Sequence, residues 1–253
     1  MNKTDFKTLI VILVVLLIFS IIVLILYNVT EKEKIDMSGN FIVDGNRFFE
    51  YDGTKWRELG SIDSIIMNKF NVYSNNTYVG NYSVSENNGK YYFFDDEYES
   101  HDVTSPFIAI SEDSEVSVID YKKADFNSSD YSKASEYLKS IDIDYDGEYN
   151  ISDKYIVDLD NDNNSDYIYV LSNQLYSDDV FYVVFANIDN DYITINKQIG
   201  VSEVERYSLG WVLNISNDKL NDIILREEDR EFYNYYLYRY FKNREYQRIL
   251  PNE

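Results

Sequence analysis

Residues 41–59 read FIVDGNRFFEYDGTKWREL. Three short apolar or aromatic runs are separated here by Asp44-Gly45 and Asp52-Gly53. Asp-Gly is a dipeptide that supplies the positive φ angles of tight hairpin turns, and short apolar runs between such turns are typical of strands. The stretch therefore predicts a β-meander.

The strand pattern continues to the C-terminus. Further strand-sized runs are NVYSNN, TYVGNYSVS, KYYFFDD, PFIAIS, EVSVIDY, YIVDLD, DYIYVLS, FYVVFANI, YITINKQI, GWVLNIS, DIILRE and YNYYLYRY. In the run at residues 231–241, aromatic residues occupy both strand faces, so either both faces are covered or one is a Tyr-rich binding surface; we expect core packing. The fold class expected is mainly β, or β-rich α+β.

One segment interrupts the strands, at residues 129–141, with the spacing of an amphipathic helix. Ser129 or Asp130 is available as its N-cap. The residues predicted on its apolar face are Tyr131, Ala134, Tyr137, Leu138 and Ile141. The domain is therefore expected to contain one short helix.

Composition limits the classes of function. The chain has 253 residues, a net charge of −22 and no basic stripe, so nucleic-acid binding, which needs Lys and Arg to displace phosphate counterions, is not expected. The absence of Cys excludes disulfides, thiolate metal sites and Cys nucleophiles. The one histidine, His101, lies in the polar stretch ESHDVTS, which favours a surface loop over a catalytic triad.

An apolar segment near the N-terminus, residues 9–27, reads LIVILVVLLIFSIIVLILY and contains one polar residue, Ser20. At a rise of about 1.5 Å per residue, such a helix spans the roughly 30 Å of a bilayer's hydrocarbon. It is longer than the apolar region of a signal peptide, and YNVTEKEK follows it instead of a small-residue cleavage site. The sequence predicts a single transmembrane helix, with the lipid bilayer as its partner.

The orientation of this helix is not decided by basic residues, because Lys3 and Lys7 before it are matched by Lys32 and Lys34 after it. A short tail is easily left in the cytoplasm while an acidic domain is translocated, so we expect a cytoplasmic N-terminus and an extracytoplasmic domain. The expected parts are a cytoplasmic tail at 1–7, a transmembrane helix at 8–27, a juxtamembrane linker at 28–40, a β-meander subdomain at 41–128 and a helix-plus-β subdomain at 129–253.

An aspartate-rich loop lies within VDLDNDNNSDYIYV, residues 157–170. Its aspartates at relative positions 1, 3, 5 and 9 are Asp158, Asp160, Asp162 and Asp166. This spacing lets a tightly wound loop turn carboxylates inward onto one hard cation, and oxygen-only ligation favours Ca²⁺. Asn163, at the sixth position, tolerates the positive φ of a sharp turn. Tyr169 stands where an EF-hand has Glu, and a strand follows, so the loop is not an EF-hand.

A strand, an acidic loop of this spacing and a second strand resemble the calcium loops of FG-GAP/VCBS-type repeats, which are similar to integrin propeller blades. The spacing recurs 56 residues later, before another strand, at Asn214, Ser216, Asp218 and Asp222. This copy has two carboxylates and has Lys219 at the sixth position, so a side-chain cation is expected to replace the metal. The Phe-Gly and Gly-Ala-Pro signatures are absent, so the resemblance implies a local calcium-loop device.

A third loop, DIDYDGEYNISD at residues 142–153, follows the predicted helix. Asp142, Asp144 and Asp146 stand at EF-hand positions, but Asp153 replaces the final Glu and a strand-like run follows. A half-EF-hand-like second site is one interpretation. For every loop, the alternative interpretation is a solvated acidic turn, which an Asp-rich chain forms without any metal.

These features favour a membrane-anchored extracytoplasmic module with a structural Ca²⁺ loop, which binds a partner or associates with the cell envelope. The sequence does not identify the protein or glycan partner, and catalysis is the less expected role. Two alternatives are an anchored hydrolase that uses carboxylates and an accessory subunit of a membrane complex. A deep cleft that holds two carboxylates in unlike environments would favour the hydrolase.

Overall fold

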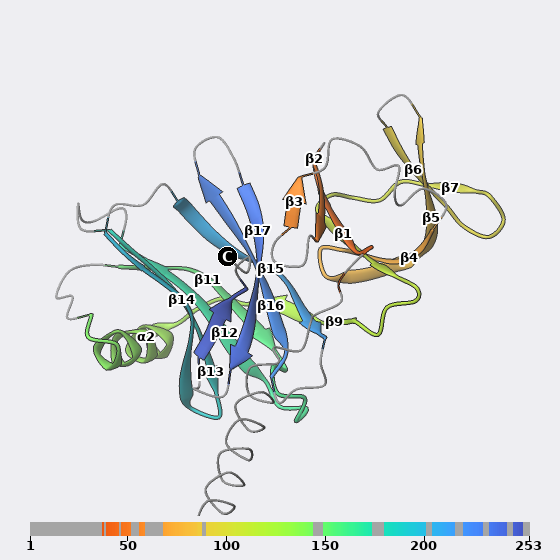
Figure 1. The fold of residues 1–253 in the computed structure, drawn as a ribbon. Coiled ribbons are helices and arrows are strands. Elements are labelled where there is room, and N and C mark those ends of the chain that lie inside the picture. Colours follow the sequence, from red (N-terminus) through yellow and green to blue (C-terminus); the bar gives the residue numbers. More distant parts are fainter. Residues whose placement is uncertain are drawn as a thin grey trace, which may run out of the picture. The chain divides into compact units, whose positions relative to one another are not determined.

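In the part of the chain that the structure describes, three antiparallel sheets and one helix make up the fold (Figure 1). The computed structural model describes residues 37, 39–45, 47–51, 56–58, 68–87, 90–143, 149–173, 180–200, 204–215, 220–229, 233–241 and 245–249. All of them belong to one compact unit, residues 37–253. Within these ranges, no helix is both long enough and apolar enough to cross a membrane. The span predicted at residues 8–27 lies outside them.

Sheet A is the N-terminal sheet. Its strands are β1 (Phe41–Asp44), β2 (Arg47–Tyr51), β3 (Trp56–Glu58), β4 (Lys69–Ser74), β5 (Thr77–Asn87), β6 (Lys90–Phe94), β7 (Ser100–His101) and β8 (Phe107–Ser111). Their order is β3-β2-β1-β8-β4-β5-β6-β7. β1 pairs with β2 and β2 with β3, both antiparallel, which confirms the meander predicted from residues 41–59. Gly45 turns the chain between β1 and β2 with φ +61.

Sheets B and C have five strands each and the same connectivity: one short strand, then four strands that are consecutive in sequence. Sheet C consists of β10 (Tyr121–Lys123), β11 (Asn150–Val157), β12 (Asp166–Ser172), β13 (Phe181–Ile188) and β14 (Asp191–Ile199). Sheet B consists of β9 (Ser117–Ile119), β15 (Val204–Asn214), β16 (Asp222–Asp229), β17 (Tyr233–Phe241) and β18 (Glu245–Arg248). Because β9 and β10 precede residue 128, the predicted subdomain boundary at 128/129 does not coincide with a boundary between sheets.

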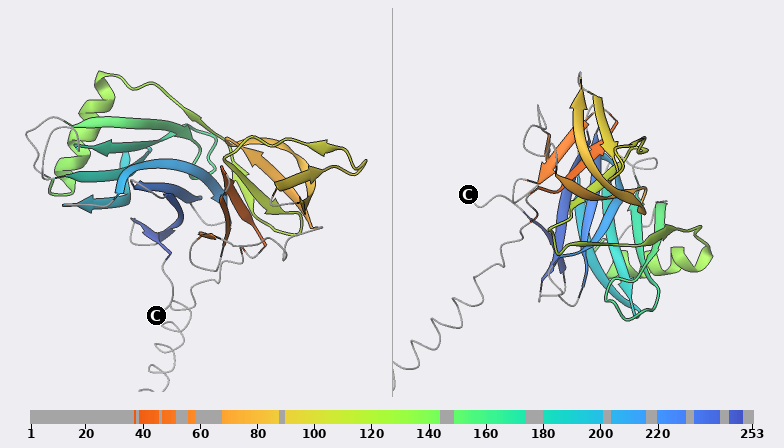
Figure 2. Two further views of the ribbon diagram at one scale, coloured as in Figure 1. Left: turned by 90° about the horizontal axis from the view of Figure 1, so that it is seen from above. Right: turned by 90° about the vertical axis from the view of Figure 1, so that its right-hand side faces the viewer.

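The main core lies between sheets B and C. Side chains of alternating residues in β13, such as Val184, face sheet B, while the intervening ones, such as Phe185, pack under the helix. Both faces of β13 are therefore covered, which is why all eight of its residues are buried. Figure 2 shows the resulting order of helix, sheet C and sheet B. A separate cluster, which includes Phe41, Phe70 and Phe107, lies within sheet A.

The Tyr-rich strand β17 also has both faces covered. Tyr236, Tyr238 and Tyr240 pack against the main core. On the opposite face, the ring of Tyr235 lies edge-on against Phe49 of β2, with 5.4 Å between centroids. These contacts confirm core packing for the described part of β17.

The helix α2 (Ser128–Ser140) confirms the helical prediction, with a different cap. Asn127 is the N-cap: its side chain accepts from Ser129 N, and Asp130 accepts in return from Asn127 N. The helix therefore starts one residue earlier than predicted, because Asn127 is the cap and Asp130 is the third residue of the helix. Ala134, Tyr137 and Leu138 are buried as predicted, whereas Tyr131 is 36% exposed.

A buried charged cluster joins α2 to sheet C. The Oδ2 atom of Asp130 lies 2.9 Å from Lys154 Nζ on β11, and its Oδ1 accepts a hydrogen bond of 2.7 Å from Tyr169 OH on β12. Burial raises the pKa of Asp130, but the hydrogen bonds from Tyr169, Asn127 and Lys154 outweigh it and leave the pKa lowered. Both Asp130 and Lys154 are buried, so removal of either residue would leave the charge of the other buried and unpaired.

Candidate metal centre

The aspartate loop connects β11 to β12 and spans residues 158–165. Asn161 and Asn163 adopt φ of +60 and +66, which confirms the conformation predicted for Asn163. These turns aim backbone N–H groups inward: Asp162 N and Asn163 N donate to the Asp158 carboxylate at 3.1 and 2.9 Å. The loop is therefore wound around the side chain of Asp158.

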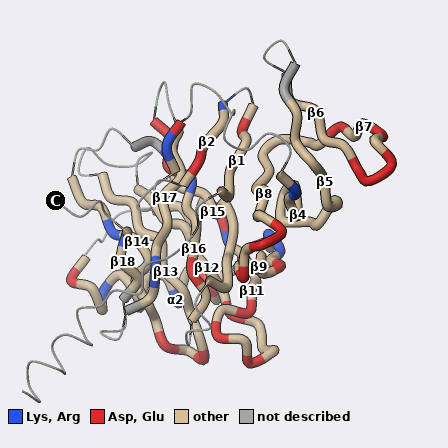
Figure 3. The backbone as a smooth tube through the Cα atoms, turned by 45° about the vertical axis from the view of Figure 1, so that its right-hand side comes forward, with Lys and Arg blue, Asp and Glu red and all other residues tan. Residues whose placement is uncertain are grey.

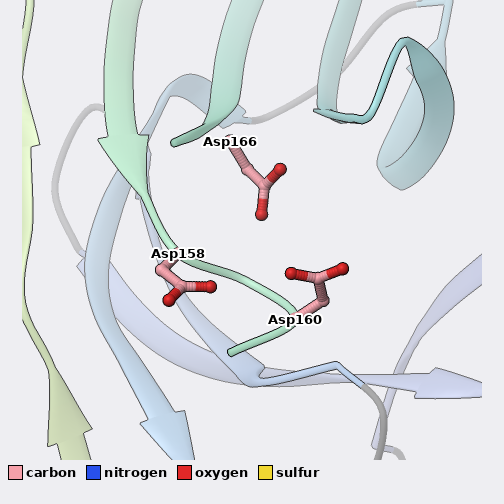
Figure 4. Close-up of side chains that lie close together, drawn as sticks. All are labelled: Asp158, Asp160 and Asp166. Atoms are coloured by element: carbon pink, nitrogen blue, oxygen red, sulfur yellow. The ribbon is translucent and has the colours of Figure 1, made fainter. Parts of the chain in front are cut away.

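Three of the four predicted ligands converge. Asp158, Asp160 and Asp166 each place one carboxylate oxygen so that all three atoms lie within 4.8 Å of one another. Figure 4 shows the carboxylates turned toward a common space from the end of β11, the loop and the start of β12. Asp166 is only 3% exposed, and Leu159 N donates to its Oδ2 at 2.9 Å.

Asp162 belongs to a second group, with Asp160 and Asp189. Asp189 was not predicted from the sequence. It lies in the β13–β14 turn, where it and Asn190 have positive φ, typical of a hairpin turn. Tyr167 pairs with Asn187, so the register carries the residues after Ile188 past Asp166 and beside the loop. Only the pairing of β12 with β13 brings Asp189 here.

The loop concentrates negative charge. Burial raises the pKa of Asp166 to about 6; the Leu159 N–H opposes this shift, and the charges of Asp160, Asp162 and Asp158 add to it. Burial and the charge of Asp162 also raise the pKa of Asp160. Among the residues that the structure describes, no ion pair joins Lys or Arg to any of these aspartates.

The related position in sheet B is built differently. Asp222, the first residue of β16, lies 56 positions after Asp166 and is equally buried. Its Oδ1 atom lies 3.8 Å from Arg239 Nε on β17. Extending the register from Ile223↔Tyr238 by one step places Arg239 opposite Asp222, and the same step from Tyr167↔Asn187 places Ile188 opposite Asp166. Sheet B thus supplies a cation where sheet C supplies an isoleucine.

The sequence prediction for this loop named a different residue. A side-chain cation was expected to face the second loop, and Lys219 was the residue named for it. Within the described residues the cation is Arg239, contributed by a different strand. Ser216, Asp218 and Lys219 lie outside the described residues.

The two loops contact each other. Asn221, just before β16, donates from its backbone N–H to Leu159 O at 2.8 Å and from its side chain to Asp158 O at 3.1 Å. Its amide also exchanges hydrogen bonds with the side chain of Asn161. The backbone of the aspartate loop is therefore held both by sheet B and by the loop's own carboxylates.

Of the remaining predicted ligands, only Asp142 belongs to the described residues. Asp142 follows α2 with φ +59 and joins neither group of converging acids. Asp144 and Asp146 lie outside the described residues. His101, expected in a surface loop, lies instead on the short strand β7, with its Nε2 atom 2.7 Å from Asp95 Oδ2 and its ring beside Tyr82.

The residues of this centre fit a hard divalent cation. All are carboxylates, and Ca²⁺ takes oxygen ligands at short range in loops of this kind. Figure 3 shows acidic residues in many other turns, so acidity alone does not distinguish the centre. Its distinction is a buried carboxylate, Asp166, placed with two others and without a described basic partner.

Asp166→Asn is expected to remove a pH dependence from the metal-free protein. The folded-state pKa of about 6 exceeds the ordinary value of 3.8, so this carboxyl stabilises the fold at low pH, and that contribution is lost as pH rises from about 4 through 6. In chelator, the variant should therefore gain stability relative to the native protein at pH 7 but not at pH 4. Urea unfolding at both pH values measures this; an unchanged difference between the two proteins would contradict it.

The chain was also compared with known proteins. No family model, no curated protein and no solved structure matches it at a significant level.

Proposed function

We propose that the chain is a single-pass membrane protein whose β-rich domain acts outside the cytoplasm as a binding or envelope-associated module, stabilised by Ca²⁺ in the β11–β12 loop. The observation that carries the metal assignment is the convergence of Asp158, Asp160 and Asp166. Support for the anchor comes from the apolar sequence of residues 9–27.

The role of the metal is structural. Without a cation, the carboxylates repel one another and oppose closure of the turn between β11 and β12. A divalent cation reverses the sign of that interaction. At the related position of sheet B, the positive charge beside Asp222 comes from Arg239, which supports a charge-neutralising role for the metal. The resemblance to FG-GAP/VCBS-type loops, in which Ca²⁺ holds two strands together, agrees with it.

The metal assignment is tested by calorimetric titration of the full-length protein with Ca²⁺. We expect saturable binding of one ion in the micromolar range and much weaker binding of Mg²⁺, which demands a near-octahedral site. Asp160→Ala should abolish the binding, because Asp160 belongs to both groups of converging acids. Asp113→Ala, at an exposed acid before β9, is the matched control and should bind as the native protein does. Absence of heat at millimolar Ca²⁺ would overturn the assignment.

The location is tested separately, by adding protease to intact cells. A cytoplasmic tail at residues 1–7 predicts that the domain after residue 40 is digested from outside. Such a domain would also meet Ca²⁺ at millimolar levels, which saturate a site of micromolar affinity. Complete protection of the domain, when a known surface protein in the same cells is digested, would show the opposite orientation.

The hydrolase alternative gains no support from the described residues. It requires a cleft with two carboxylates in unlike environments. A cavity between sheets A and B has one carboxylate, Asp44, among its lining residues, so this cavity does not supply such a pair.

A further inference from the structure

A cavity of about 230 Å³ lies between sheet A and sheet B, at the end of β1. Residues from both sheets and from β10 line it, among them Asp44, Tyr121, Ser208, Trp211, Arg226 and Tyr235. An apolar cavity of about 150 Å³ accommodates a benzene ring. This one therefore has room for a six-membered ring that carries substituents.

The two charged residues of the cavity neutralise each other. Asp44 Oδ2 lies 3.0 Å from Arg226 Nε and accepts a hydrogen bond of 2.7 Å from Tyr235 OH. Their side chains are 14% and 25% exposed, and Asn75 on the rim is exposed, so a ligand can enter here from solvent. A charged ligand would have to compete with this ion pair, whereas an uncharged one would not.

One donor in the cavity wall lacks a partner. Trp211 is 1% exposed, and its indole Nε1–H has no acceptor among the described residues. A buried donor without an acceptor is destabilising. Trp211 lines the cavity, so a ligand oxygen that reached this N–H would supply the acceptor. The arrangement thus favours a ligand that carries hydroxyl or carbonyl oxygens.

Aromatic rings form the apolar part of the wall. The rings of Trp211 and Tyr235 lie 5.6 Å apart, centroid to centroid. Tyr121 is fixed by a hydrogen bond of 2.7 Å from its hydroxyl to Gly210 O. Rigid aromatic faces with a few placed polar groups are the usual composition of a small-molecule site.

From these observations we infer that the cavity binds an uncharged, hydroxyl-bearing ring, of which a monosaccharide unit is the chemical class. Hydroxyl groups both donate and accept, which matches a wall that includes Ser208 and Asp44 beside the aromatic rings. The inference rests on the proposed binding role for its biological meaning. Its chemistry is independent of the metal loop and of the membrane anchor.

The chain allows a direct optical test, because it has only two tryptophans. Trp56→Phe leaves Trp211 as the sole indole. The full-length variant, in a zwitterionic detergent without a sugar headgroup, is titrated with D-glucose, N-acetyl-D-glucosamine, cationic D-glucosamine and anionic D-glucuronate. We expect a saturable change in Trp211 emission with at least one of the uncharged sugars, and weaker binding of both charged ones.

Ser208→Leu, made in the same background, fills the cavity and should weaken binding at least about tenfold. Ser85→Leu, at a half-buried serine of β5 that does not line the cavity, is the matched control and should leave binding unchanged. If Ser208→Leu does not melt cooperatively, Ser208→Val, which adds less volume, replaces it.

Three outcomes would overturn the inference: no saturable response to any uncharged sugar, a response that filling the cavity does not weaken, or charged sugars that bind as tightly as uncharged ones. The titrations are run with Ca²⁺ and with chelator. Because the metal proposal is judged by heat of Ca²⁺ binding and this one by Trp211 emission, failure of either is recognised without reference to the other.

Discussion

Asp130→Ala is expected to lower the free energy of unfolding by about 3–5 kcal/mol, the usual cost of breaking a buried ion pair from one side. The substitution removes the partner of Lys154, which is 8% exposed, and the acceptor of Tyr169 OH. It also removes half of the capping box of α2. Urea unfolding of the full-length protein at pH 7 measures the loss.

Two further variants separate the ion pair from the helix itself. Glu136→Ala changes an exposed acid of α2 whose described contact is a hydrogen bond from Tyr192, so we expect a loss below about 1 kcal/mol. Adding Lys154→Met to Asp130→Ala should recover part of the loss, because it removes the stranded charge. If Asp130→Ala were no worse than Glu136→Ala, the cluster would not hold α2 to sheet C.

Removal of Ca²⁺ is expected to lower the melting temperature by roughly 5–10 °C. With Ca²⁺ near 1 mM and a dissociation constant on the order of 10 μM, binding stabilises the native state by about 2.7 kcal/mol. For a domain near 200 residues, this energy corresponds to the stated shift. Differential scanning calorimetry of the full-length protein, with chelator and then with Ca²⁺ restored, measures it.

Asp166→Asn is the control for the effect of Ca²⁺ on the melting temperature. Without Ca²⁺ the variant should be more stable than the native protein at pH 7, since it lacks a carboxylate whose pKa burial raises to about 6. With Ca²⁺ the order should reverse, because an amide is a poorer ligand. A melting temperature that chelator does not change, in the native protein, would leave the loop as a solvated acidic turn.

Local patterns predicted the elements of this fold well. Alternating apolar residues and Asp-Gly or Asn-rich turns are short-range signals, and they identified the β1–β3 meander, the helix and the conformation of Asn163. The cap of α2 was misplaced by two or three residues because Asn127, Ser129 and Asp130 are all acceptable caps in sequence. Only the hydrogen bonds of the folded helix choose among them.

In the candidate metal centre, short-range sequence signals predicted some residues and missed others. Asp158, Asp160 and Asp166 could be predicted because the ligand spacing lies within one loop. Asp189 and Arg239 could not, since each reaches its place through the pairing of neighbouring strands, and the register of a pair is a property of the whole sheet. The cavity between sheets A and B has no sequence signal at all, because its wall is assembled from distant segments.

If the β11–β12 loop binds Ca²⁺ as proposed, the matched loops of sheets B and C would close at different times. Arg239 is part of the chain, so the clasp at Asp222 can close as soon as its strands meet, in any compartment. A clasp at Asp166 that depends on Ca²⁺ closes only where that ion is abundant. In a newly made chain, sheet B would then be complete, whereas the aspartate loop of sheet C would stay open until the domain reaches Ca²⁺. Maturation of the domain would thereby be coupled to its arrival in a compartment that contains Ca²⁺.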